Sequence, residues 1–159
     1  MSVHSIQSHT ASAASRVAFI QSSWHREIVD QCRQAFAEEM ASHGMDNDGI
    51  DFHAVAGAFE IPLLAQRLAR SGKYSAVVAT GLVVDGGIYR HDFVAQAVIS
   101  GLMQVQLDTG VPMISAVLTP HHFHAGQEHQ QFFREHFRVK GREAALACID
   151  TVSKLQALA

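Results

Sequence analysis

Apolar residues follow two patterns along the chain, short uninterrupted runs and longer stretches with a period of three to four residues. The apolar runs predict strands over residues 17–21, 76–84 and 113–118, and the turn residues at 46–49 indicate that a further strand begins after them, over residues 50–55. The periodic stretches predict helices over residues 26–43, 62–71, 93–109, 127–136 and 142–157. Gly141 stands between the last two stretches and is expected to separate them, because glycine is unfavourable inside a helix.

The order of these elements is typical of a parallel sheet. Strands that are apolar almost throughout and that alternate with helices are covered on both faces. We therefore predict an α/β fold, a three-layer α/β/α sandwich with a four-stranded parallel sheet of the flavodoxin-like kind. The 159 residues fit one domain over residues 16–159, preceded by a frayed N-terminal tail over residues 1–15.

The composition is that of an ordinary globular protein, and it disfavours several classes of function. Hydrophobic residues make up 48% of the chain, and the formal net charge is −3 without a basic stripe, so we expect no nucleic acid and no membrane as partner. The N-terminus lacks the features of a secretory signal. Cys32 and Cys148 form no CxxC pair, which favours reduced thiols and a cytoplasmic location.

Candidate site residues follow from the fold, because open parallel sheets bind ligands beyond the carboxyl ends of their strands. Polar and aromatic residues are dense there and include the only tryptophan, a diglycine, a glutamate, an arginine and several histidines. Packing alone does not account for this density. The segments that follow the four predicted strands are residues 22–25, 57–60, 85–91 and 119–122.

Each feature of these segments has a structural and a functional interpretation. Trp24 is either a core aromatic or a flat surface on which a heteroaromatic ring stacks. Glu60 is either a solvated carboxylate at a helix N-terminus or an acceptor for substrate hydroxyls. The diglycine at 86–87 is either a simple turn or a phosphate cradle. Arg90 and His91 are either surface residues or a phosphate ligand and a proton carrier.

Four stretches, in this order and spacing, resemble the 6,7-dimethyl-8-ribityllumazine synthase family. They are residues 55–62 (VAGAFEIP), 81–94, 110–119 and 140–145 (KGREAA). The resemblance implies a transferase of riboflavin biosynthesis that condenses 5-amino-6-(D-ribitylamino)uracil with 3,4-dihydroxy-2-butanone 4-phosphate, without cofactor or metal. The alternative is a weakly catalytic or non-catalytic paralogue that binds riboflavin or lumazine. A flavodoxin-like electron carrier ranks last, because no Ser/Thr-rich phosphate loop follows the first strand.

The resemblance also assigns substrate-binding positions. Trp24 takes the place of the aromatic residue that stacks on the pyrimidine, and His25 that of a small polar residue near the ribityl chain. The other matches are Ala58, Phe59 and Glu60 at the ribityl chain, Val83 and Val84 at the uracil edge, Gly87 and Ile88 at the phosphate, and Ile114 and Ser115, which in the family reach the site from a neighbouring subunit.

The sequence departs from the family pattern at two places. Arg90 stands where the family has its proton-transfer histidine, so either His91 transfers the proton from a shifted loop or Arg90 acts as an electrostatic group. The last predicted strand is followed by a longer, histidine-rich segment that resembles the rhizobial and Brucella-type members. Arg134 and Arg138 are candidates for the phosphate arginine, and we favour Arg138, which stands closer to Lys140. Lys140 lies in a stretch that matches the family and is a further candidate cation for the phosphate.

The resemblance further implies a homo-oligomer, a pentamer or a pair of pentamers, with each site between subunits. The apolar helix over residues 93–107 is then a candidate wall of the central channel. A cluster of histidines has two interpretations, a metal site and a pH-sensitive interface between pentamers, and the second is favoured because two of its members are five residues apart rather than four. The cluster is His121, His122, His124 and His129.

Overall fold

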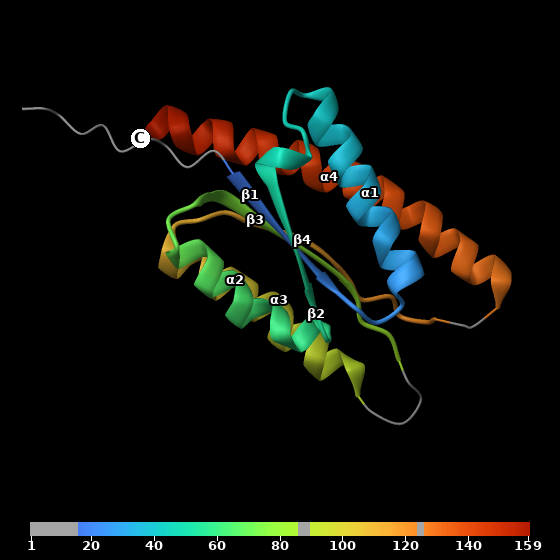
Figure 1. The fold of residues 1–159 in the computed structure, drawn as a ribbon. Coiled ribbons are helices and arrows are strands. Elements are labelled where there is room, and N and C mark those ends of the chain that lie inside the picture. The colour runs from blue at the N-terminus through green and yellow to red at the C-terminus, as the bar shows by residue number, and fades with distance from the viewer. Residues whose placement is uncertain (1–15, 86–89, 124–125) are drawn as a thin grey trace, which may run out of the picture.

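The computed structural model describes residues 16–85, 90–123 and 126–159. Within these ranges, four parallel strands form one sheet in the order β2-β1-β3-β4 (Figure 1). Helices α1 and α4 cover one face, and α2 and α3 cover the other, which confirms the predicted sandwich. The elements are β1 (Arg16–Ser22), α1 (Arg26–Ser42), η1 (Asn47–Gly49), β2 (Ile50–Val55), η2 (Ala58–Glu60), α2 (Ile61–Arg70), β3 (Tyr74–Leu82), α3 (His91–Thr109), β4 (Met113–Leu118) and α4 (Gln127–Leu158).

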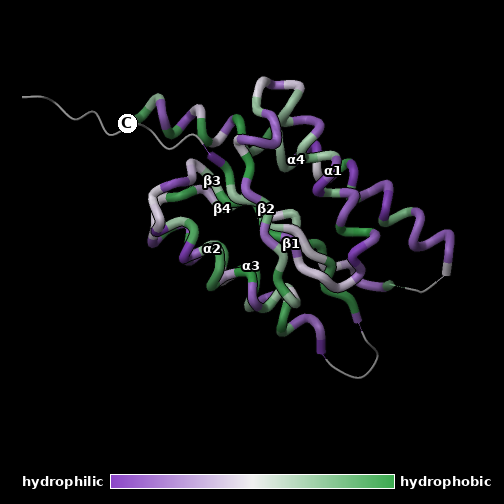
Figure 2. The backbone as a smooth tube through the Cα atoms, viewed as in Figure 1, coloured by the Kyte–Doolittle hydropathy of each residue, from purple (hydrophilic) through white to green (hydrophobic). Residues whose placement is uncertain are grey.

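Alternation of side chains along the strands builds a separate core on each face of the sheet. In β1, Val17 and Phe19 belong to the core under α1 and α4, whereas Ala18 and Ile20 belong to the core over α2 and α3. All four are almost completely buried. Because both faces are covered there, four successive residues at the centre of β1 are all apolar. Figure 2 shows hydrophobic residues concentrated on the strands and the inner sides of the helices.

Strand β3 lies two residues earlier than the sequence predicts, at Tyr74–Leu82 instead of 76–84. Its last residue pairs with Leu118, the last residue of β4, and the N–H of Val83 donates to the Leu118 carbonyl at 2.9 Å. Because β4 ends at this level, the ladder does not continue. Val83 and Val84 therefore leave the sheet and reach the cavity described below.

Helix α4 is continuous through Gly141, so the predicted break at this residue is wrong. Gly141 is buried where α4 crosses α1. A Cβ added there would overlap the Cys32 carbonyl oxygen and lie 3.0 Å from both the Ala35 Cβ and the Phe36 backbone nitrogen. The glycine therefore permits the two helix backbones to approach closely, and the packing that results outweighs its poor intrinsic helix propensity.

A polar cluster ties three strands together at their amino ends. The Arg16 guanidinium donates to both carboxylate oxygens of Asp51 and, at 2.7 Å, to the Asp48 carbonyl. The Tyr74 hydroxyl donates to Asp51 at 2.6 Å. The hydrogen bonds from Arg16 and Tyr74 lower the pKa of Asp51 to about 2. Burial and the bond to Asp51 raise the pKa of Tyr74 to about 12.

The two cysteines are free and buried, and burial raises the pKa of both thiols to about 11. They therefore pack as small apolar side chains rather than as reactive thiolates.

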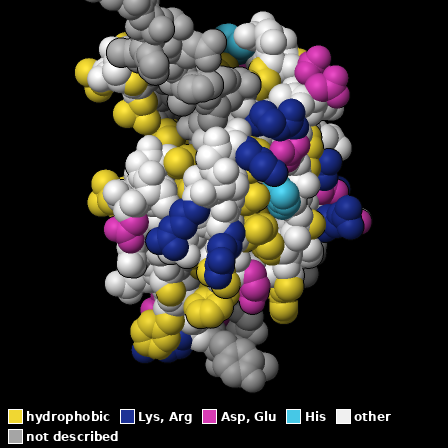
Figure 3. All heavy atoms as spheres, turned by 60° about the vertical axis from the view of Figure 1, so that its left-hand side comes forward, with side chains coloured by type: hydrophobic (Ala, Val, Ile, Leu, Met, Phe, Trp, Pro, Cys, Tyr) yellow, Lys and Arg dark blue, Asp and Glu magenta, His cyan; other side chains and the backbone are white. Residues whose placement is uncertain are grey.

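On the face shown in Figure 3, Lys and Arg side chains are interspersed with acidic and hydrophobic ones. Among the described residues, no helix is both long and apolar enough to cross a membrane.

Candidate active site

The carboxyl ends of β1, β2 and β3 open onto a cavity of about 630 Å³. Its wall is formed by the turn after β1, by η2, by the segment that leads from β3 into α3, and by the segment after β4. This is the edge at which parallel α/β sheets bind ligands. The described residues that line the cavity are Trp24, His25, Gly57, Ala58, Phe59, Glu60, Leu82, Val83, Val84, Asp85, Arg90, His91, Val94 and Phe123.

Trp24 and Glu60 come together around Gly57, beyond the end of β2. The Gly57 N–H donates to Glu60 Oε2 at 2.9 Å, which holds the carboxylate at the start of η2. A Cβ added at Gly57 would lie 3.1 Å from this oxygen and 3.6 Å from Trp24 Nε1. The indole is 68% exposed. The structure therefore presents an open aromatic face next to a carboxylate whose orientation is fixed by the backbone.

The turn between β1 and α1 sets the positions of Trp24 and His25. His25 has a φ of 53°, in the left-handed region where histidine is enriched among non-glycine residues. The Ser23 hydroxyl donates to the Val55 carbonyl at 2.7 Å. The His25 ring lies edge-on to the ring of Phe123, with their centroids 4.9 Å apart. The turn is thus attached to β2 on one side and to the segment after β4 on the other.

Arg90 and His91 line the cavity at the start of α3. Arg90 Nη2 lies 3.1 Å from Asp92 Oδ2, and the Arg90 Cζ atom lies 4.2 Å from the centre of the Phe93 ring. The hydrogen bond from Arg90 lowers the pKa of Asp92. Both partners of this ion pair are more than half exposed, so the pair is weak in solvent and leaves Arg90 able to turn toward a bound anion.

Comparison with known proteins identifies the family to which this arrangement belongs. The family model described as 6,7-dimethyl-8-ribityllumazine synthase matches residues 14–156. The chain belongs to the lumazine synthase family. The protein named 6,7-dimethyl-8-ribityllumazine synthase 2 from Pseudomonas syringae pv. tomato is 61% identical over 90% of this chain and 84% of its own length. The 6,7-dimethyl-8-ribityllumazine synthase of Rhodococcus erythropolis is 61% identical over 90% of this chain and 92% of its own length. The synthase 2 of Bradyrhizobium diazoefficiens is 53% identical, with coverages of 90% and 86%.

Two residues that the lumazine synthase resemblance assigned to the site do not line the cavity of their own chain. Ile114 is half-buried against the core under α1 and α4, and Ser115 is exposed. Both lie on β4, which forms one edge of the sheet, several residues before its carboxyl end.

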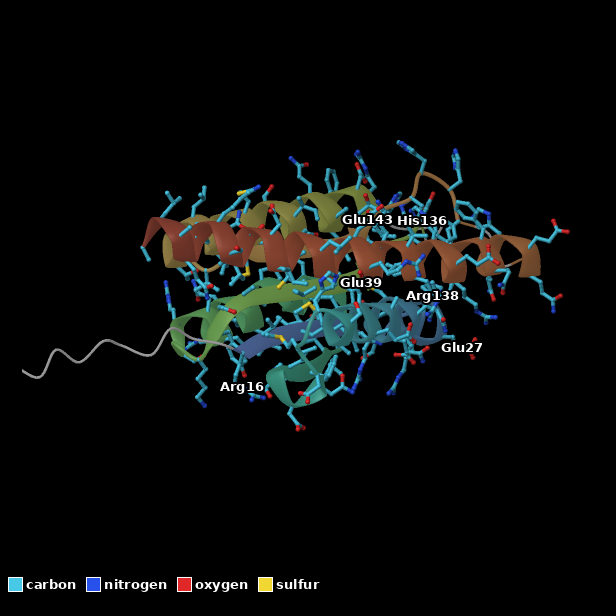
Figure 4. All side chains as sticks on the ribbon, turned by 90° about the horizontal axis from the view of Figure 1, so that it is seen from above. Arg16, Glu27, Glu39, His136, Arg138 and Glu143 are labelled. Carbon is cyan, nitrogen blue, oxygen red and sulfur yellow. The ribbon has the colours of Figure 1, made fainter. Side chains whose placement is uncertain are left out.

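The candidate phosphate cations also lie away from this cavity. Arg138, which Figure 4 labels on α4, pairs with Glu38 of α1 at 2.8 Å. Lys140 pairs with Glu143 at 2.8 Å along α4. Arg134 pairs with Glu27, in the first turn of α1, at 2.7 Å. Within one chain, Arg134 and Arg138 thus pair with α1, Lys140 pairs along α4, and none of the three lines the cavity.

Parts of the predicted site lie outside the described residues. These are the phosphate positions Gly87 and Ile88, and His124 of the histidine cluster. Among the described residues, the structure contains no group of three or more His, Cys, Asp or Glu side chains that could hold a metal ion. His129, another member of the cluster, packs its ring against Phe123 and Phe133.

Five cavity residues were not among the predicted site residues. Gly57 and Asp85 belong to the segments that follow the predicted strands, so the carboxyl-end rule already pointed to them. Leu82, Val94 and Phe123 line the cavity with apolar side chains, which the sequence does not distinguish from core positions. For Phe123, the available signal was its place just beyond the fourth strand.

Proposed function

We propose that this cavity condenses 5-amino-6-(D-ribitylamino)uracil with 3,4-dihydroxy-2-butanone 4-phosphate, which yields 6,7-dimethyl-8-ribityllumazine, phosphate and water in riboflavin biosynthesis. Membership of the lumazine synthase family supports this reaction. The juxtaposition of the Trp24 indole and the Glu60 carboxylate around Gly57 carries the proposal, because it joins a surface for the pyrimidine to an acceptor for ribityl hydroxyls.

The reaction needs two substrates to be held together more than it needs a strong catalyst. The 5-amino group attacks the ketone to form an imine with loss of water, phosphate is then eliminated, and the 6-amino nitrogen closes the ring with loss of a second water. Orientation of two bound reactants removes much of the entropic barrier of such steps. Stacking on Trp24 fixes the pyrimidine plane, and hydrogen bonds to Glu60 fix its ribityl chain.

Arg90 and His91 supply the charge and the proton transfer. The exposed Arg90 guanidinium is placed to stabilise the phosphate as it leaves. His91 lies at the N-terminal end of α3, and a histidine can exchange protons near neutral pH. In this assignment, His91 carries protons between the amino groups and the departing oxygens, whereas Arg90 acts through its charge.

We also propose that each site is completed by a neighbouring copy of the chain in a pentamer or a pair of pentamers. Two observations support this assembly. Ser115 is exposed on the edge strand β4, away from its own cavity. Helix α3 leaves five large apolar side chains exposed, and four of them, Phe93, Ile99, Met103 and Leu107, do not line the cavity. An exposed apolar surface of this kind marks an interaction surface.

The free, buried state of both cysteines supports a cytoplasmic location.

A steady-state assay with both substrates tests the proposed reaction. Trp24→Ala should weaken pyrimidine binding by ~1–3 kcal/mol, the scale of aromatic stacking on a base. Glu60→Gln removes the charge but keeps an oxygen that can accept from the Gly57 N–H, so its effect isolates the ribityl contact. Phe132→Ala, at an exposed position of α4 outside the cavity, is the matched control. Wild-type kinetic constants in both cavity variants would refute the assignment.

A further inference from the structure

Phe123 reaches the cavity from the segment after β4, where the sequence departs from the family pattern. We propose that Phe123 is a substrate-binding residue whose ring forms an apolar wall for the heteroaromatic ring of the pyrimidine substrate. This inference rests on the proposed function of the cavity. It adds a second aromatic contact, besides Trp24, that determines which rings the site holds.

Contacts with other rings fix the position of Phe123. Its ring centroid lies 4.9 Å from that of His25, 5.6 Å from that of His129 and 5.5 Å from that of Phe133. Phe133 is only 6% exposed and belongs to the core under α1 and α4. Phe123 is therefore supported by the core of the domain, although it lies in a connecting segment.

His129 strengthens this support from the first turn of α4. Its Nε2 atom lies 3.3 Å from the His122 carbonyl oxygen, next to Phe123 in the chain. The His129 ring also contacts Phe133 edge-on, with their centroids 5.0 Å apart. A wall held from several sides loses little freedom when a ligand binds, so its contact adds to affinity at a small entropic cost.

The burial of Phe123 distinguishes a binding role from a purely structural one. Phe133, behind it, is almost completely buried, whereas Phe123 is half-buried and keeps part of its ring on the cavity wall. Phe132 is exposed, stacks on His136 and does not line this cavity. Of these three phenylalanines, Phe133 is therefore a core residue, Phe123 a cavity residue and Phe132 a surface residue.

Binding can be measured without turnover because Trp24 is the only tryptophan of the chain and lines the cavity. Titration with 5-amino-6-(D-ribitylamino)uracil alone, in the absence of the butanone phosphate, should change the Trp24 fluorescence and yield Kd. Phe123→Ala should raise this Kd about tenfold, the scale of one aromatic contact on a base. Phe123→Leu keeps apolar bulk but no flat face, and it should raise Kd about threefold.

Two further variants define the outcome. Phe132→Ala should bind like the wild type, because its ring lies outside the cavity. Wild-type Kd values for both Phe123→Ala and Phe123→Leu would overturn the proposal, and the leucine variant decides the matter where the alanine variant does not fold. Glu60→Gln separates the two claims. If Glu60→Gln weakens binding while the two Phe123 variants do not, only the proposed role of Phe123 is refuted. If Glu60→Gln and both Phe123 variants all bind like the wild type, the proposed function of the cavity is refuted as well.

Discussion

Replacement of Gly141 by alanine tests the close approach of α1 and α4. The added methyl group would overlap the Cys32 carbonyl oxygen and crowd the Phe36 backbone nitrogen. Both atoms belong to a helix backbone, so they cannot move aside as a flexible side chain would. Overpacking of this kind costs roughly 1–3 kcal/mol, and the upper end applies here. Alanine regains about 1 kcal/mol of helix propensity, so the net loss should be ~2 kcal/mol.

At this chain length, each kcal/mol shifts the melting temperature by roughly 2–4 °C, so Gly141→Ala should melt about 4–8 °C lower. Circular dichroism at one fixed protein concentration measures this shift, since assembly couples stability to concentration. Ala147→Gly is the matched control, because Ala147 is exposed on the same helix and reports propensity alone, with an expected loss of ~1 kcal/mol. A melting temperature for Gly141→Ala at or above the wild-type value would refute the packing argument.

Four further predictions follow from the pKa shifts, the start of α3 and the histidine cluster. Burial and the hydrogen bond to Asp51 raise the folded pKa of Tyr74 from 10.0 to about 12, so the contribution of its neutral hydroxyl to stability is fully present below about pH 10 and is lost as the pH rises through 12. Tyr74→Phe should cost ~1 kcal/mol at neutral pH and flatten the alkaline loss in urea titrations. Asp51 has a folded pKa of about 2 instead of 3.8, so its contribution is present above about pH 4 and is lost as the pH falls toward 2, and melting curves of Asp51→Asn should lack this acid-dependent part. His91→Gln should lower kcat by ~10²–10⁴-fold, whereas an unchanged kcat assigns proton transfer to Arg90 or water. If the proposed pairs of pentamers meet at the histidine cluster, light scattering should show them dissociating as the pH is lowered from about 8 to 5, because protonated histidines repel one another, and one constant mass over this range would contradict this.

The central strands β1 and β3 were predictable because both of their faces are covered, and a doubly buried strand has a nearly continuous apolar sequence. The boundaries of β2 and β4 agree with the predicted runs. Strand β3 ends earlier because its length is set by where β4 stops, which is a property of the neighbour rather than of its own residues. Gly141 was misinterpreted for a related reason, since the need for a glycine comes from α1, which is far away in the sequence.

The same distinction applies to the cavity. Trp24, Glu60, Arg90 and His91 were identified because the carboxyl-end rule and the family resemblance both point to the ends of strands. Phe123 lies under the same rule, but its apolar side chain and its histidine-rich surroundings favoured other interpretations.

The position of Ser115, on an edge strand away from its own cavity, has a genetic consequence. A variant substituted at Trp24 keeps an unaltered β4 edge. A variant substituted at Ser115 keeps an unaltered cavity. If the site is shared as proposed, two variants that are each assayed where they show no turnover should, when refolded together in equal amounts, regain about one quarter of the normal rate, because that share of head-to-tail junctions pairs the intact half of each. Such complementation between alleles would distinguish a site formed between two subunits from a site formed within one chain, without a structure of the oligomer.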